Sequence, residues 1–162
     1  MSKTIHELKS TIPQIGALRQ ILIRPKKRGE ITSSDTLDIT VSQGLLGDHY
    51  SKSGGKRMVT LIQEEHLDVI AAILDKEIDP TKLRRNLVVS GINLLSLHDM
   101  QFRIGPDVIL QGTGHCHPCS RMETNLGPGG YNAVRGHGGI TATVIQGGRI
   151  RINDSIRAFP DE

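Results

Sequence analysis

Residues 115–119, with the sequence His-Cys-His-Pro-Cys, contain both cysteines of the chain, three positions apart and next to two histidines. A thiolate binds soft metals and attacks electrophilic sulfur when cations, a metal or a helix N-terminus lower its pKa. We therefore expect the chemistry of this protein at residues 115–119, which we call the Cys loop.

Three kinds of site fit the Cys loop. Cys116 and Cys119 could bind zinc together with one of His115, His117 or His137, although their spacing is only half of a zinc signature. A dithiol redox site needs Cys-x-x-Cys to lead from a strand directly into a helix, and here we expect a glycine-rich segment instead. The third kind is a single thiolate that holds a metal cofactor, with basic residues elsewhere binding the phosphate of that cofactor.

Three further stretches have residue types that suit ligand binding: 44–57, 84–86 and 127–139. Glycines let the backbone approach a ligand closely, and lysine or arginine binds phosphate. Each stretch taken alone also fits an ordinary solvated turn. The third interpretation of the Cys loop is the most economical because it gives these stretches a common role. The candidate ligand-binding residues are Gly47, Lys56, Arg57, Arg84 and Asn86.

The elements that must position these residues are mostly strands. Hydrophobic periodicity predicts one amphipathic helix over 63–76. Alternating and β-branched runs predict many short strands, so we expect an α+β, mainly β fold with a β-barrel and a few peripheral helices. Residues 1–14 are expected to form a flexible arm, and 15–162 a single domain. The predicted strands are 15–23, 37–41, 87–89, 101–104, 108–111, 140–144, 150–152 and 155–159.

Composition excludes several classes of protein. The net charge of +3 and a pI near 9.0 are only mildly basic, and two tyrosines, two phenylalanines and no tryptophan leave few aromatic platforms for nucleic acid. No apolar run reaches the roughly 20 residues of a membrane-spanning helix. With two cysteines and no signal-peptide pattern, we expect a soluble cytoplasmic protein, either a monomer or a homodimer.

Nearly the whole chain after residue 15 carries an ordered series of short motifs. They are 21–25 (ILIRP), 44–48 (GLLGD), 84–91 (RRNLVVSG), 102–105 (FRIG), 116–123 (CHPCSRME), 136–140 (GHGGI) and 147–148 (GG). In this order and spacing they resemble the MOSC domain family, named after the C-terminal domain of molybdenum cofactor sulfurase, and within it the small stand-alone bacterial members of the YiiM-like kind. The resemblance implies a MOSC-type β-barrel that binds a molybdenum pterin (molybdopterin-type) cofactor.

The resemblance also implies roles for individual residues. Cys119 corresponds to the cysteine that is a direct molybdenum ligand, and Cys116 to a companion. Arg84 and Asn86 are expected around the pterin or its phosphate. Two further residues, Lys56 and Arg57, fall near another cofactor-contacting stretch.

The implied reaction is reduction of N-hydroxylated compounds, such as hydroxylamino purines (6-N-hydroxylaminopurine among them), amidoximes and hydroxylamines, with the cofactor carrying the redox chemistry. Asp48, His49, His117 and His137 are candidates for relaying protons. Since we expect no ferredoxin-like domain in this chain, electrons should come from a separate reductase. We likewise expect no desulfurase domain of its own, although pyridoxal phosphate binding is a label of the family.

Two other functions stay open at this point. Cys119 could carry a persulfide for the assembly of a cofactor or metal–sulfur cluster. Alternatively, the chain could be a non-catalytic module that binds zinc or a small anion.

Overall fold

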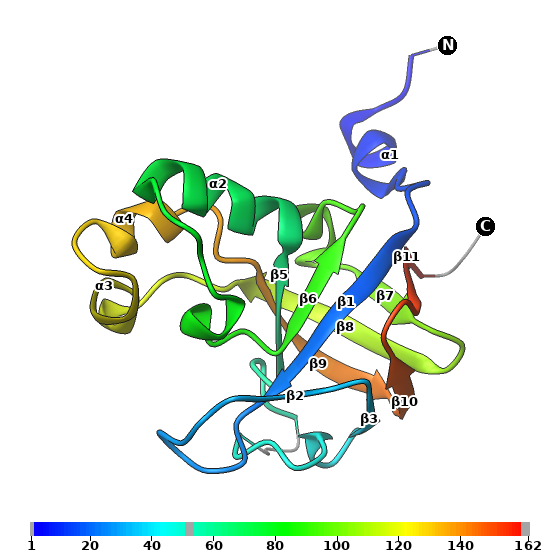
Figure 1. The fold of residues 1–162 in the computed structure, drawn as a ribbon. Coiled ribbons are helices and arrows are strands. Elements are labelled where there is room, and N and C mark those ends of the chain that lie inside the picture. Colours follow the sequence, from blue (N-terminus) through cyan, green and yellow to red (C-terminus); the bar gives the residue numbers. More distant parts are fainter. Residues whose placement is uncertain (1, 51–53, 160–162) are drawn as a thin grey trace.

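The fold was analysed in a computed structural model, and the structure describes residues 2–50 and 54–159 (Figure 1). Three sets of residues lie outside the described ranges. They are residue 1, at the start of the expected arm; residues 51–53, part of the glycine-rich stretch 44–57; and residues 160–162, at the end of the expected domain.

Within the described residues, seven strands form a closed β-barrel in the order β11-β7-β8-β9-β5-β6-β1, and β1 pairs with β11 to close it (Figure 1). Neighbouring strands are antiparallel except for β5 and β6, which are parallel. The strands are β1 (Gly16–Ile23), β5 (Val59–Gln63), β6 (Leu87–Ser90), β7 (Gln101–Ile104), β8 (Val108–His115), β9 (Ile140–Gln146) and β11 (Ser155–Ala158).

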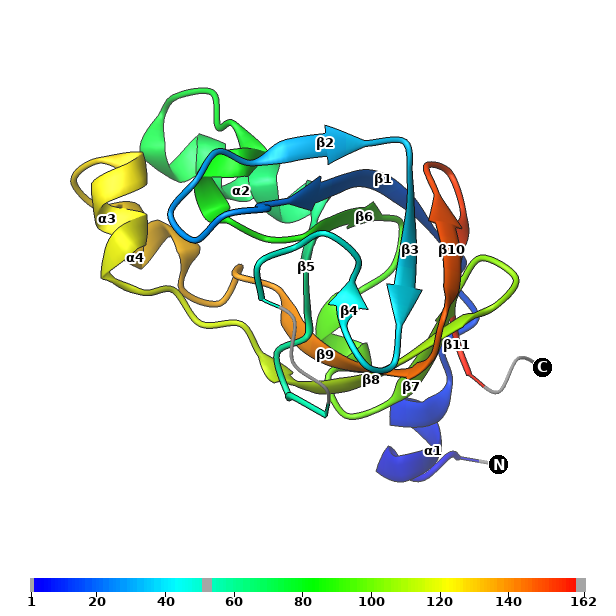
Figure 2. The ribbon, with the colours of Figure 1, turned by 90° about the horizontal axis from the view of Figure 1, so that it is seen from below.

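A second, smaller sheet lies beside the barrel, in the order β10-β3-β4 (Figure 2). It consists of β3 (Thr36–Thr40), β4 (Gly44–Leu45) and β10 (Gly148–Arg151). One further strand, β2 (Thr32–Ser34), pairs with β1 outside the closed barrel.

The helices fill the connections between strands. Because β5 and β6 are parallel, their connection must return to the end of the barrel where β5 begins. The crossover connection that does so contains α2 and η1. Figure 1 shows α2, α3 and α4 together at one end of the barrel, with α1 on the opposite side. The helices are α1 (Ile5–Ser10), α2 (Glu64–Leu74), η1 (Pro80–Leu83), η2 (Leu94–Leu97), α3 (Ser120–Leu126) and α4 (Gly130–Val134). No helix among the described residues is long and apolar enough to span a membrane.

Two clusters of buried hydrophobic residues form the core of the barrel and attach the helices to it. The barrel interior contains Leu61, Leu87 and Phe102, whereas Ile62 and Val88 belong to the cluster beneath α2, α3 and α4. Successive residues of a strand point to opposite faces, so β5 and β6 bury both faces. Strands of this kind have continuous apolar sequences rather than alternating ones.

The predicted fold class is confirmed, and the predicted strands and the helix over 63–76 correspond to observed elements. Sequence patterns missed β2, β4, β5, α3 and α4. In particular, the expectation of a glycine-rich segment directly after the Cys loop is wrong, because α3 begins at Ser120. Met122 and Leu126, four positions apart, are both buried and anchor this helix on the barrel. In the expected arm, Ile5–Ser10 forms α1, whose first turn is closed by a capping box from Thr4.

Candidate functional site

A cleft of about 330 Å³ brings together residues that are far apart in the sequence. Its walls come from the end of β1, the turn after β4, the start of β5, the junction of η1 with β6, and the Cys loop. Seven residues with predicted roles line it: Asp48, His49, Arg57, Arg84, Asn86, Cys116 and Cys119.

The two cysteines face this cleft in different ways. Cys119 is exposed and precedes α3 as its N-cap residue, and its side chain makes no capping hydrogen bond. Cys116 is only 1% exposed, and its backbone N–H donates to the carbonyl oxygen of Gly139 (2.9 Å). Its Sγ accepts a contact from Nη2 of Arg57 at 3.8 Å. Cys116 is therefore held in place, while the thiol of Cys119 is accessible.

The order of elements around the Cys loop corrects the sequence argument against a dithiol site. Strand β8 ends at His115, and α3 starts directly after Cys119. A Cys-x-x-Cys pair that leads from a strand into a helix is therefore present, and both thiols are free. The structure thus supplies the context that a dithiol site needs.

Arg85 is buried next to the Cys loop and holds it through hydrogen bonds to backbone carbonyl oxygens. It is 7% exposed, and its guanidinium donates to the carbonyl oxygens of Gly138 (Nε, 2.8 Å), Leu83 (Nη1, 2.8 Å) and Cys116 (Nη2, 3.1 Å). Burial lowers the pKa of Arg85, while negative charge at Cys116 raises it. The sequence analysis placed Arg85 in the candidate ligand-binding stretch 84–86 and did not predict this structural role.

Asn86 ties two strands together at the floor of the cleft. Its Oδ1 accepts from the backbone N–H and the hydroxyl of Thr60 (both 3.1 Å), and its Nδ2 donates to the carbonyl oxygen of Leu22 (3.2 Å). These bonds join β5 to β1, and they leave only one amide hydrogen of Asn86 for a ligand.

Asp48 and His49 fix the end of β1. Asp48 is 8% exposed, and its two oxygens accept from the backbone N–H groups of Arg24 (2.8 Å) and Tyr50 (3.3 Å). Nε2 of His49 lies 3.2 Å from Nη2 of Arg24, and its Nδ1 lies 3.2 Å from the carbonyl oxygen of Arg24. Since a guanidinium can only donate, Nε2 is the acceptor and Nδ1 carries the hydrogen.

Arg24 is a cleft residue that sequence reasoning did not identify. Its Nε is buried and has no hydrogen-bond partner among the described residues. Burial lowers the pKa of Arg24, and the charge of Arg121 lowers it further, against the opposing effect of Asp48. A buried N–H without a partner is costly, so an anionic ligand in the cleft would stabilise this side chain.

The other predicted residues lie outside the lining of the cleft. His117 lines a separate hollow with Tyr131. His137 packs edge-on against His66, with 5.5 Å between the ring centroids. Lys56 is exposed. Gly47 also lies outside the lining, in an exposed turn with a φ of 89° that glycine adopts readily.

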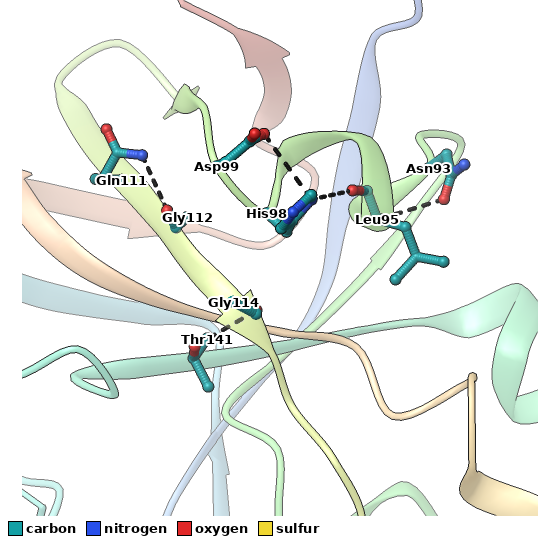
Figure 3. Close-up of polar contacts among 8 residues, drawn as sticks. All are labelled: Asn93, Leu95, His98, Asp99, Gln111, Gly112, Gly114 and Thr141. Carbon is teal, nitrogen blue, oxygen red and sulfur yellow. Dashed lines mark hydrogen bonds and ion pairs between the residues drawn. The ribbon is translucent and has the colours of Figure 1, made fainter. Parts of the chain in front are cut away.

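Three histidines line up at the end of β8. The rings of His98 and His115 stack with centroids 4.7 Å apart, and those of His115 and His117 are 5.9 Å apart. Nδ1 of His98 lies 2.8 Å from the carbonyl oxygen of Leu95 (Figure 3). Among the described residues, no group of three or more His, Cys, Asp or Glu side chains could hold a metal ion. This geometry does not support a zinc site made by the Cys loop.

Two signals in the sequence could have identified the missed arginines. Arg85 lies two positions before Leu87 and four before Val89, both of which point into the barrel interior, so the period of a strand places it on the same face. Arg24 directly follows the apolar strand 15–23, at the edge of the barrel where Asp48 also lies. In both cases the position relative to a strand indicates burial, while the residue type alone suggests a solvated charge.

Comparison with known proteins gave a family and a fold. The sequence model of the MOSC domain matches residues 45–157. The YUAD protein from Bacillus subtilis has a similar structure (TM-score 0.77, 21% identity, covering 90% of this chain and 97% of that one). YiiM from Escherichia coli gives a TM-score of 0.68 at 17% identity (90% and 71% covered), and YiiM from Geobacillus stearothermophilus 0.68 at 15% (88% and 74%). No protein of curated function matches the chain.

Proposed function

Because the chain belongs to the MOSC domain family, we propose that its cleft binds a molybdenum pterin cofactor and that the protein reduces N-hydroxylated compounds. The observation that supports this most directly is the accessible, free thiol of Cys119 in a cleft that four arginines also line. A soft sulfur donor suits molybdenum, and arginines suit the phosphate of a pterin cofactor. One thiolate is enough when the cofactor brings its other ligands with it.

The polar groups of the cleft fit such an anionic ligand. The buried Nε of Arg24 lacks a partner in the described part of the chain, and Asp48, the one carboxylate of the lining, already accepts two backbone hydrogen bonds. Arg84 and Arg57 also line the cleft. The lining therefore offers an excess of positive charge that a phosphate would neutralise.

When bound, the cofactor would supply the two-electron chemistry that removes the N–O oxygen. Reduction of R–NHOH to R–NH₂ consumes two electrons and two protons and releases the oxygen as water, and a separate reductase provides the electrons. Cys119 would hold the metal, and Arg85 would hold the Cys loop through the carbonyl oxygen of Cys116. His49 is the one histidine that lines the cleft, and its imidazole can both donate and accept a proton, so we assign it the passing of protons. Asp48 would position Arg24 through the backbone.

Metal analysis tests the assignment of the ligand. The protein is expressed in a host that makes the cofactor, and molybdenum and pterin are measured in the wild type, in Cys119→Ser and in the matched control Cys116→Ser. We expect Cys119→Ser to lose most of the molybdenum and all reduction of an N-hydroxylated purine, and Cys116→Ser to keep the metal. Full molybdenum content in Cys119→Ser would refute the role of Cys119.

The accessible thiol of Cys119 also supports a second candidate, a persulfide carrier. Incubation with a cysteine desulfurase and cysteine should then add one sulfur atom to Cys119, detectable by mass spectrometry of the intact protein and its peptides. If the adduct is missing while Cys119 still reacts with iodoacetamide, the carrier function is wrong.

A further inference from the structure

A second, strongly basic pocket of about 400 Å³ adjoins the cleft. Its walls come from the loop between β1 and β2, from η1 and from α3, and Figure 2 shows that loop on the same side of the barrel as α3. We call it the basic pocket. Five of its lining side chains are cationic: Arg24, Arg28, Lys82, Arg84 and Arg121.

The cations of the basic pocket outnumber its carboxylates. Among the described residues, none of these five cations takes part in an ion pair. Glu30 is the one carboxylate in the lining. Five cations that line one concavity with a single carboxylate create a positive potential that attracts an anion.

The backbone also points to a built site. Arg28 and Arg84 both have a φ of 61°, in the left-handed region that residues other than glycine rarely adopt. Such conformations cost free energy and are concentrated at functional sites. Two of the four described residues other than glycine with a positive φ therefore line the basic pocket, and Arg84 is also the C-cap of η1. Arg24, whose buried Nε has no partner in the described ranges, lines it as well.

The basic pocket and the cleft share Arg24, Ile31 and Arg84. A single elongated ligand can therefore lie across both, with its reactive end beside Cys119 and an anionic end in the basic pocket. Arginine forks recognise phosphate oxygens in pairs, and a concave site with several of them suits a phosphate group better than a flat protein surface.

We propose that the basic pocket binds the phosphate group of the substrate, so that the protein reduces N-hydroxylated nucleotides. This inference rests on the proposed function, because it assumes that the reducing centre is at Cys119. It adds a substrate class: phosphorylated compounds whose N-hydroxylated base enters the cleft. The cofactor's own phosphate would then be bound by residues of the cleft, such as Arg57, that do not line the basic pocket.

The test uses residues that line the basic pocket but not the cleft. The double variant Arg28→Gln/Arg121→Gln is compared with the wild type and with Arg135→Gln, an exposed arginine that lines neither. The first measurement is titration of the cofactor-free protein with inorganic phosphate and pyrophosphate by calorimetry. We expect the double variant to bind about tenfold more weakly or worse, the scale of one lost charge-assisted hydrogen bond, and Arg135→Gln to match the wild type.

The second measurement is kcat/KM of the molybdenum-loaded protein, with reduced methyl viologen as electron donor. The substrates are an N-hydroxylated purine base and its ribonucleoside monophosphate. We expect the wild type to prefer the monophosphate, and the double variant to lose about tenfold of that preference. Equal kcat/KM values for the two substrates in the wild type would overturn the inference.

Two other outcomes separate this inference from the proposed function. If the double variant loses molybdenum, the basic pocket holds the phosphate of the cofactor, and the inference is wrong while the proposed function stands. If the wild type contains no molybdenum and reduces neither substrate, the proposed function fails and the substrate class fails with it. Phosphate binding that the double variant lacks would in that case still establish the basic pocket as an anion site.

Discussion

Replacing Arg85 should both destabilise the protein and loosen the Cys loop. Its guanidinium donates to the carbonyl oxygens of Gly138, Leu83 and Cys116, in a site where only 7% of the residue is exposed. A hydrogen bond to a charged group contributes about 1.5–3 kcal/mol, so three of them set an upper limit of roughly 9 kcal/mol. Water entering from the cleft can solvate part of the freed carbonyls. We therefore expect Arg85→Met to cost about 3–5 kcal/mol.

Urea unfolding of the cofactor-free protein measures this cost. With a slope of about 2 kcal/mol per molar urea, the midpoint should fall by roughly 2 M. The neighbouring Arg84→Met is a matched control, since Arg84 is half-buried and makes no side-chain hydrogen bond in the described structure. We expect it to change stability by less than about 1 kcal/mol.

The same variants report on the Cys loop. Arg85→Met should change the rate of alkylation at Cys119, because the hydrogen bond that holds the backbone of the loop at Cys116 is lost. A loss below about 1 kcal/mol, equal to that of Arg84→Met, with unchanged alkylation would refute the role of Arg85 as the anchor of the loop.

Three further predictions concern the barrel and the helices. In Gly139→Ala the new Cβ would lie 1.8 Å from the carbonyl oxygen of Leu61 at a φ of +86°, so we expect a loss of about 4 kcal/mol or more in thermal or urea unfolding. In the control Gly136→Ala, with a φ of +82° and no atom within 4 Å of the new Cβ, the loss should be only about 1 kcal/mol, and similar losses would contradict the steric argument. Asn86→Ala removes the three side-chain hydrogen bonds of Asn86, two with Thr60 of β5 and one with Leu22 of β1, and should cost about 2–3 kcal/mol, whereas an unchanged urea midpoint would show that they add nothing. Burial lowers the pKa of His66 below 6.5, so the unfolded chain takes up its proton first, and stability should fall as the pH drops below about 6.5. His66→Gln should flatten that decline, and an identical pH profile would exclude His66 as its cause.

The residue patterns predicted most of the barrel but missed one of its seven strands. Alternation identified strands such as 140–144, which lie near the observed bounds Ile140–Gln146. Strand β5 (Val59–Gln63) was missed because it buries both faces and has no period of two. Helix α3 is only seven residues long, and its formation depends on the burial of Met122 and Leu126 rather than on local propensity.

The candidate site was predicted in part. Residue chemistry and motif order pointed to Cys119, Arg84 and Asn86, and all three line the cleft. His117 and His137 have equally suitable side chains, yet neither lines it, and His137 packs on His66 instead. Residue type states what a side chain can do but not which cavity it faces, because that depends on contacts between distant segments.

The sequence alone therefore determined the chemical repertoire of the protein: one short loop with two thiols, several basic stretches, and strands with the periodicity of a barrel. Tertiary structure decided how these parts combine. Closure of the barrel brings Arg24, Asp48, Asn86 and Cys119 to one cleft, although they span nearly a hundred positions of the chain. It also buries Arg85 beneath the Cys loop, where its hydrogen bonds hold Cys116. The physical reason is that burial and charge pairing are set by non-local packing, which the spacing of residues along the chain does not contain.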